Sequence, residues 1–304
     1  MIVFVAPGQG SQTPGFLEPW LADPDARDLV GAWSETIGVD LVAHGTVSDA
    51  ETIRDTAVAQ PLIVAAGLLT ARALRAAGAE IGAVAGHSVG EITAAAIAGV
   101  LSETDALSFV RTRALAMADA AAATPTGMSA VLGGSQDAVV EHATELGLEP
   151  ANYNGGGQIV VAGELDALAK LSDEPLRGTR VIPLKVAGAF HTRFMAPARE
   201  VLRDAASAFS PADPGITLWT NNDGSTISSG ARFVELLVAQ VASPVRWDLD
   251  MEAFAAAGVT GIVELAPAGA LVGLAKRGLK GVPSVGISTP DDVAAALELT
   301  QTAR

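Results

Sequence analysis

One serine of the 304-residue chain lies between two glycines, where a short apolar run meets an alanine-rich stretch. Residues 86–91 read GHSVGE and follow the apolar run 81–85. A serine hydroxyl is a strong nucleophile only when a base takes its proton and the chain presents it to substrate. A sharp strand-to-helix turn does so, and Gly86 and Gly90 leave room for it. The pattern G-x-S-x-G occurs once and predicts that Ser88 is a nucleophile, with an ordinary turn serine as the alternative.

Four histidines could supply the base. His44 and His142 suit surface or partly buried positions. His87 is adjacent to the serine, and successive side chains in such a turn point apart, so it is a candidate for substrate contact only. His191 follows the segment 127–187, at a junction between two expected domains, where clefts form. The sequence therefore favours His191 as the base, with a core or surface histidine as the alternative.

The order of these residues disfavours an ordinary esterase. The α/β-hydrolases place their histidine late in the chain, after the serine and the acid. Here no histidine follows His191 before the last residue, Arg304.

Composition excludes several classes of function. The net charge of −15 disfavours nucleic acid as a partner. The chain has no cysteine, which removes disulfides, thiolate nucleophiles and thiolate metal sites. The N-terminus, MIVFVAPGQGSQ, lacks the basic start and long apolar core of a signal peptide. Polar residues and Gln60-Pro61 interrupt the apolar runs, so we expect no membrane span and a cytoplasmic protein.

Short apolar runs alternate with longer helical stretches, which predicts a mainly parallel sheet covered by helices on both faces. The expected strands are 2–6, 83–85, 216–220 and 261–265. The expected helices are 62–76, 92–101, 105–122, 193–208, 231–242 and 291–300.

One segment has a different order. It reads strand, helix, strand, strand, helix, strand, which is the order of a ferredoxin-like unit. The ranges are 128–132, 136–146, 150–154, 158–162, 165–171 and 180–186. We therefore predict an α/β-hydrolase-like large domain, made of residues 1–125 and 190–304, with an inserted ferredoxin-like small domain at 126–189.

Six segments, in order along the chain, resemble the malonyl-CoA:acyl carrier protein transacylases of bacteria, the stand-alone actinobacterial members in particular. They are GQGSQ (8–12), AQPLI (59–63), GHSVGE (86–91), GAFHTRFMAPA (188–198), QVASPVRW (240–247) and GLAKR (273–277). The resemblance covers essentially the whole chain. One departure, an alanine before the proline of ELAPAGAL (264–271), is interpreted as variation in a surface loop.

The resemblance implies roles for the catalytic residues. Ser88 is acylated, and His191 acts as general base and acid. A backbone carbonyl from the segment matching Gln240 orients that histidine in place of a carboxylate. The oxyanion hole is formed by the backbone N–H groups of Gln9 and Val89, and a turn that brings amides to the cleft fits the two glycines of GQGSQ. A nucleotide-binding G-x-G-x-x-G is excluded there because position 13 is threonine.

The resemblance also implies a substrate pocket. A guanidinium can hold the malonyl carboxylate through two parallel hydrogen bonds. Spacing alone leaves Arg111 and Arg113 open, and the resemblance selects Arg113. The resemblance places Gln60 in the same pocket, and His87 is the further candidate for substrate contact because it lies next to Ser88. Phe190 either selects against an α-methyl group or packs in the core.

The implied reaction is transfer of malonyl from malonyl-CoA to the phosphopantetheine thiol of acyl carrier protein, through a malonyl-serine intermediate, for fatty acid synthesis. A polyketide pathway, a serine thioesterase or hydrolase, and a non-catalytic carrier-binding module are the alternatives. We expect no metal, no bound cofactor and a monomer.

Overall fold

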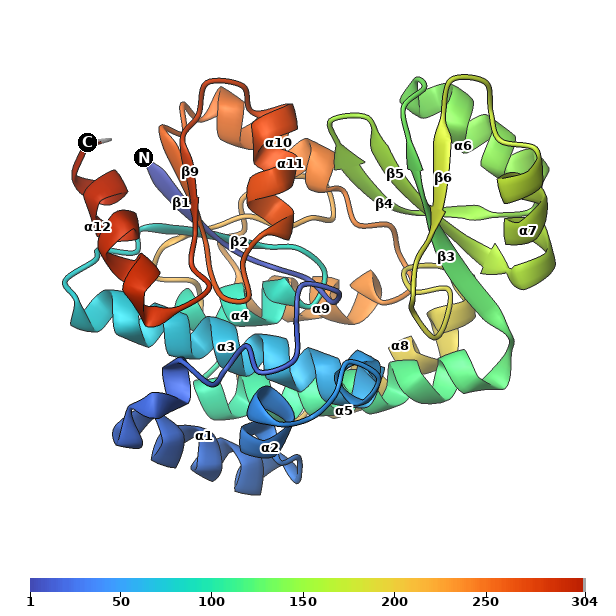
Figure 1. Cartoon of the computed structure of the whole chain (residues 1–304). Helices are drawn as coiled ribbons and strands as arrows, with labels where there is room; N and C mark the ends of the chain where they lie inside the picture. The colour runs from blue at the N-terminus through green and yellow to red at the C-terminus, as the bar shows by residue number, and fades with distance from the viewer. Residues whose placement is uncertain (303–304) are drawn as a thin grey trace.

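The computed structural model describes residues 1–302, which form two sheets (Figure 1). Five parallel strands form the large sheet in the order β7-β2-β1-β8-β9, and four antiparallel strands form the small sheet in the order β4-β5-β3-β6. The strands of the large sheet are β1 (Ile2–Ala6), β2 (Ala83–Gly86), β7 (Thr217–Leu218), β8 (Gly261–Glu264) and β9 (Ser284–Gly286).

The α-helices outside the small sheet's segment are α1 (Pro24–Ile37), α2 (Leu41–Thr46), α3 (Thr56–Ala76), α4 (Gly90–Ile97), α5 (Glu103–Ala123), α8 (Ala196–Ala206), α9 (Gly230–Gln240), α10 (Trp247–Ala256), α11 (Ala270–Gly278) and α12 (Val293–Thr302). The short 3-10 helices are η1 (Trp20–Ala22), η2 (Thr52–Arg54), η3 (Arg193–Met195) and η4 (Pro290–Asp292).

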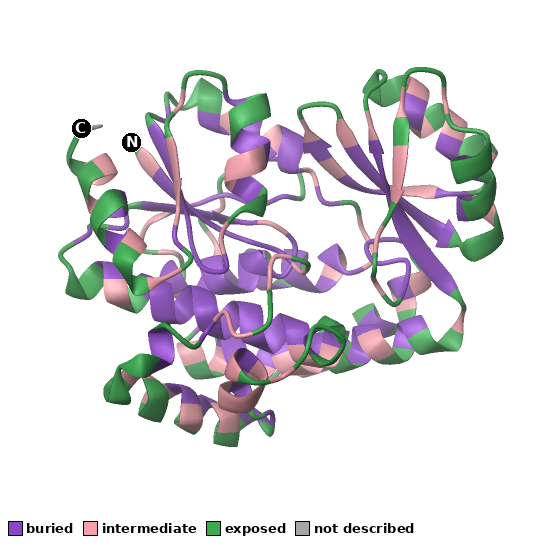
Figure 2. Cartoon of the chain, in the orientation of Figure 1, coloured by how far each residue is buried: buried purple, intermediate pink, exposed green. Residues whose placement is uncertain are grey.

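Strand β1 shows why the large sheet is buried on both faces. Its side chains alternate between two apolar clusters, because successive residues of a strand point to opposite faces. Phe4 and Ala6 join the cluster that contains α3, α4 and α5, whereas Val3 and Val5 join the cluster that contains α10 and α11. Figure 2 shows the inner strands β1, β2 and β8 almost entirely buried, and most of helix α3 buried as well. The parallel sheet covered on both faces confirms the predicted fold class.

The second sheet has the predicted ferredoxin-like order. Its elements are β3 (Thr126–Leu132), α6 (Gln136–Glu145), β4 (Glu149–Gly155), β5 (Gln158–Glu164), α7 (Leu165–Asp173) and β6 (Arg180–Pro183). β3 lies between β5 and β6 and is antiparallel to both. This order supports our proposal that residues 126–189 are an inserted small domain, whose exact limits stay a prediction.

Backbone hydrogen bonds join the small sheet to the rest of the chain. The N–H of Tyr153 donates to the carbonyl of Val245, and the N–H of Val245 donates to the carbonyl of Ala151, both at 2.9 Å. The segment between α9 and α10 therefore pairs alongside the outer strand β4, as a short parallel extension of the small sheet. This pairing fixes the small sheet above the carboxyl ends of β1 and β2.

Helix α3 begins earlier than predicted, at Thr56, and contains Pro61. A proline inside a helix leaves the carbonyl four residues earlier without its N–H partner. Here that carbonyl, on Ala57, accepts a hydrogen bond from Arg111 at 3.1 Å, which supports the longer helix. The helix is long and apolar enough to cross a membrane, contrary to our expectation, but most of it is buried inside the protein. Burial identifies α3 as a core helix.

Other boundaries also differ from the prediction. Helices α1, α2, α10 and α11 and strand β9 were not predicted, and the strand expected at 216–220 covers only Thr217–Leu218.

Candidate active site

A strained turn presents Ser88 at the end of β2. Its φ of 53° lies in the left-handed region, which residues other than glycine rarely adopt. A Cβ on Gly86 would lie 2.1 Å from the carbonyl carbon of Gly90, and a Cβ on Gly90 would lie 2.1 Å from the oxygen of Ala6. Only glycine fits at either position, so the two glycines let strand, turn and helix meet at the nucleophile.

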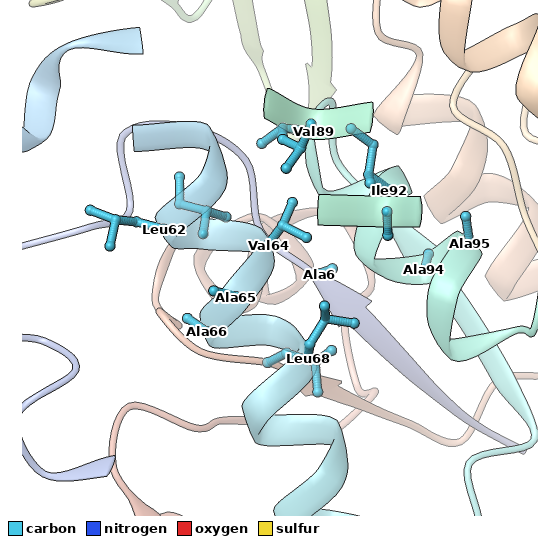
Figure 3. Packing of buried hydrophobic residues seen from close by; sticks show 14 of the residues in the cluster. Ala6, Leu62, Val64, Ala65, Ala66, Leu68, Val89, Ile92, Ala94 and Ala95 are labelled. Atoms are coloured by element: carbon cyan, nitrogen blue, oxygen red, sulfur yellow. The ribbon is translucent and has the colours of Figure 1, made fainter. Parts of the chain in front are cut away.

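The helix that follows the turn is held by close packing on α3. Val89 and Ile92 are fully buried, and Figure 3 shows them on the side that faces Val64 of α3. A Cβ on Gly67 would lie 2.6 Å from the methyl group of Thr93, so these helices approach more closely than larger side chains would allow. The position of Ser88 is therefore fixed by the core beneath it.

The structure brings Ser88 and His191 together from segments far apart in the chain. Ser88 Oγ lies 2.7 Å from His191 Nε2, and His191 Nδ1 lies 2.8 Å from the backbone oxygen of Gln240. A carbonyl oxygen only accepts hydrogen bonds, so Nδ1 carries the ring proton and the lone pair of Nε2 faces the serine. His191 also has a positive φ, 62°. The pair has the geometry of a nucleophile with its base.

Burial, together with the positive charge of Arg113, lowers the pKa of His191 to about 3. The imidazole is therefore neutral at physiological pH and free to accept a proton.

Arg113, of the two arginines on α5, faces the serine. It is 1% exposed, and its Nη1 donates to Gln60 Oε1 at 2.7 Å. Its Nη2 donates to Gln240 Oε1 at 2.8 Å and lies 3.4 Å from Ser88 Oγ. Burial lowers the pKa of Arg113 to about 9, which leaves it charged at neutral pH. The site thus contains a buried cation held by neutral amide oxygens.

A cavity of about 440 Å³ opens over Ser88 and His191. Residues of the small sheet, of the turns that follow β1 and β2, and of α11 line it. Arg113 lies behind Gln60 and Ser88, to which it is hydrogen-bonded. Among the lining residues are the predicted Gln9, Gln60, His87 and Phe190, and also Met128, Asn152, Asn154, Val160, Leu184 and Arg277.

The remaining predicted residues surround the turn. His87 points away from Ser88, and its Nε2 lies 2.9 Å from Asn154 Oδ1 of the small sheet. Burial lowers the pKa of His87. The turn that holds Gln9 contacts the same histidine, since a Cβ on Gly8 would lie 2.9 Å from its Nδ1. Val89 directly precedes α4.

Sequence analysis missed Glu91 and Asn221. Glu91 Oε1 accepts from the N–H of Asn221 at 2.8 Å, and Oε2 accepts from Gln240 Nε2 at 2.5 Å. Burial raises the pKa of Glu91 to about 7, opposed by these hydrogen bonds. The signal was present, because Glu91 is the one charged residue of GHSVGE and opens an apolar helix. Asn221 also donates to the carbonyl of Gly86, but nothing in its sequence context indicates a role.

The interpretation of 264–271 as a surface loop is wrong. Glu264, Leu265, Ala266 and Pro267 are buried. The Glu264 carboxylate accepts the N–H groups of Gly269, Leu271 and Val272, each at 2.9 Å. A buried acid therefore holds the start of α11, the helix that forms one wall of the cavity.

Replacing Gly90 tests the packing of the turn. Gly90→Ala would place a methyl group against the oxygen of Ala6, so Ser88 should move. We expect labelling of Ser88 by an uncharged fluorophosphonate to slow by about 100-fold, because displacements near 1 Å have that effect. Gly31→Ala is the matched control: its Cβ meets nothing within 4 Å inside helix α1, and it should label normally. Normal labelling of Gly90→Ala would contradict the role of the close approach.

The neutral state of His191 predicts a flat pH profile for the same labelling. Because the pKa of His191 lies near 3, the imidazole stays unprotonated between about pH 5.5 and about pH 8. We expect the rate, measured by gel fluorescence, to change less than about threefold over that range. A labelling rate that falls on acidification with a midpoint at about pH 6.5 would contradict this prediction, because it would show that His191 has the ordinary histidine pKa.

Comparisons with known proteins agree with this geometry. The family model described as "Acyl transferase domain" matches residues 3–297. The malonyl CoA-acyl carrier protein transacylase of Mycobacterium tuberculosis (strain ATCC 25618 / H37Rv) is 51% identical over 297 residues, which cover 96% of this chain and 98% of that protein. The Escherichia coli (strain K12) protein of the same name is 32% identical over 305 residues, which cover 97% of this chain and 98% of that protein.

Solved structures give the same result. The crystal structure of MCAT from Mycobacterium tuberculosis has a TM-score of 0.93 at 50% identity and covers 99% of both chains. A malonyl-transacylase in complex with its type II PKS acyl-carrier protein has a TM-score of 0.92 at 28% identity and covers 98% of this chain and 99% of that one. The chain therefore belongs to the acyl transferase domain family.

Proposed function

We propose that the chain transfers the malonyl group from malonyl-CoA to the phosphopantetheine thiol of acyl carrier protein, and so supplies units for fatty acid synthesis. The observation that carries this proposal is the buried guanidinium of Arg113 beside the Ser88–His191 pair. One methylene separates the malonyl carboxylate from its thioester carbonyl. Arg113 Nη2 lies 3.4 Å from Ser88 Oγ. A guanidinium this close to the serine can bind the carboxylate of an acyl group as short as malonyl while Ser88 attacks its carbonyl. The names of the relatives given above support the same activity.

In the first half-reaction the malonyl carboxylate accepts hydrogen bonds from Arg113, and Ser88 Oγ attacks the thioester carbonyl. His191 Nε2 takes the hydroxyl proton as the bond forms. The N–H groups of Gln9 and Val89 bind the oxyanion of the tetrahedral intermediate, where positioned donors have the greatest effect. When the intermediate breaks down, the C–S bond breaks and the CoA sulfur takes the proton from His191. Malonyl-Ser88 remains.

The second half-reaction repeats these steps in reverse. The pantetheine thiol gives its proton to His191 and attacks the malonyl ester, and Ser88 leaves with that proton. Neither half needs a metal or a bound cofactor, because the proton and the charge are handled by His191, Arg113 and the amides.

Two other residues shape the choice of acyl group. Gln60 holds Nη1 of Arg113, and so aims the guanidinium. Phe190 lines the cavity next to His191, where its ring would crowd an α-methyl group and favour malonyl over methylmalonyl. His87 links the turn to the small sheet through Asn154 and supports the wall around the acyl chain.

A polyketide pathway is the second candidate, since one similar structure is a malonyl-transacylase in complex with a type II PKS acyl-carrier protein. A thioesterase is less well supported, because hydrolysis of neutral acyl groups would gain nothing from a buried cation. We place the enzyme in the cytoplasm with its CoA and carrier substrates.

Intact-protein mass spectrometry tests the proposal. Incubation with malonyl-CoA should give a malonyl adduct that maps to Ser88, and addition of phosphopantetheinylated carrier protein should transfer it. Ser88→Ala should form no adduct, because the attacking oxygen is gone. Equal rates of hydrolysis with and without carrier protein would instead identify a thioesterase.

Arg113→Ala tests the carboxylate clamp. We expect kcat/KM for malonyl-CoA to fall by about 100-fold or more, the usual effect of removing one partner of a buried charge pair. Acylation by acetyl-CoA should stay unchanged or improve. Arg111→Ala is the matched control, because Arg111 bonds to the carbonyl of Ala57 on α3 and should leave the malonyl-to-acetyl ratio unchanged. An unaltered ratio in Arg113→Ala would refute the clamp.

A further inference from the structure

The guanidinium of Arg113 and the buried carboxylate of Glu91 are linked through the side chain of Gln240. Arg113 Nη2 donates to Gln240 Oε1, and the other end of the same amide, Nε2, donates to Glu91 Oε2. Gln240 Nε2 also lies 3.0 Å from the backbone oxygen of Ser88. The three side chains form a chain in which a neutral amide separates the two charges.

The hydrogen bonds from Arg113 through Gln240 to Glu91 are consistent with only one orientation of the Gln240 amide. If the amide of Gln240 were reversed, its oxygen would face three acceptors, Glu91, the Ser88 carbonyl and Asn221 Oδ1. Its NH₂ group would then face the guanidinium, which only donates. Glu91 therefore helps to fix which end of the amide is presented to Arg113, together with the Ser88 carbonyl and Asn221 Oδ1.

Glu91, whose pKa of about 7 leaves it ionised above neutral pH, carries the negative charge of this region, and its neighbour Asp250 does not. Asp250 is fully buried, and neither of its oxygens has a hydrogen-bond partner among residues 1–302. Glu91 accepts from Asn221 and Gln240. An ionised carboxylate requires such donors when it is buried. Burial and the charge of Glu91 both raise the pKa of Asp250, which is therefore a neutral acid.

We propose that Glu91 is a positioning residue for substrate choice: through the amide of Gln240 it holds Arg113 ready for a carboxylated acyl group without pairing with it. The inference rests on the proposed malonyl transfer. A carboxylate in direct contact with Arg113 would occupy the hydrogen bonds that the substrate needs. With the amide between them, Glu91 balances the buried charge at a distance and leaves the guanidinium available. The substrate carboxylate then meets a cation bound only to neutral oxygens.

The variant Glu91→Gln removes the charge and keeps the shape. The NH₂ end of the new side chain cannot accept, so either the N–H of Asn221 or Nε2 of Gln240 loses its acceptor and the hold on the Gln240 amide weakens. We expect kcat/KM for malonyl-CoA to fall by about 10- to 100-fold, the range for a buried group left unsatisfied. Acylation by millimolar acetyl-CoA and labelling by the fluorophosphonate should stay within about threefold of wild type, because neither reaction uses Arg113. An equal loss with all three reagents would overturn the inference and leave Glu91 as a support of the serine turn.

Asp250→Asn is the matched control for neutralising a buried acid. Because Asp250 is already uncharged, this variant should keep the wild-type malonyl-to-acetyl ratio. A loss of ratio like that of Glu91→Gln would show that the charge was assigned to the wrong residue, and would refute the proposal.

The exchange Glu91→Gln/Gln240→Glu tests the separation of charges even if Glu91→Gln alone folds poorly. It keeps a carboxylate–amide pair but moves the carboxylate against Arg113. We expect a folded protein, by thermal melting, whose malonyl-to-acetyl ratio has fallen by at least about tenfold. A retained ratio would overturn the inference. By contrast, a wild-type enzyme that forms no malonyl-Ser88 would defeat the proposed function itself, so the two failures are distinguishable.

Discussion

The buried positive charge of Arg113 is the constraint on which the rest of the site depends. A guanidinium at 1% exposure is costly unless its hydrogen bonds are satisfied. Gln60 and Gln240 each accept one of them, from two different helices, α3 and α9. The same charge helps to keep His191 neutral. Substrate attraction, the state of the base and the arrangement of the amides therefore follow from one cation.

The fold supplies these groups by bringing the ends of several elements to one place. Ser88 lies in the turn after β2, Arg113 on α5, His191 after the small sheet and Gln240 at the end of α9. None of them is near another in the sequence. Parallel strands collect their carboxyl ends at one edge, where binding sites of open sheets lie. The close contacts at Gly86 and Gly90 let the nucleophile reach that edge.

The sequence predicted those parts of the fold whose signal lies in a local pattern of residues. β1 was predicted with its observed bounds, and the small sheet's order of elements was right because its strands and helices are short, alternating and separated by clear turns. The bounds of α3 were wrong because Arg111, distant in sequence, satisfies the carbonyl that Pro61 leaves free. Glu91 was missed because a charged residue at the start of a helix is usually solvated. Only the fold shows that Asn221 and Gln240 surround it. Ser88 and His191 were indicated by the residues alone, whereas the choice of Arg113 came from the resemblance, since spacing alone could not separate Arg111 from Arg113.

The use of a backbone carbonyl to orient His191 follows from the charge of the site. A carboxylate at that position would stabilise the protonated imidazole and raise its pKa. It would also add a negative charge to a site that receives an anionic acyl group. The carbonyl of Gln240 fixes the ring proton on Nδ1 without adding a charge. The side chain of the same residue accepts from Arg113 and donates to Glu91. One glutamine thus serves both the base and the cation without adding a charge, which an acidic residue in its place could not do.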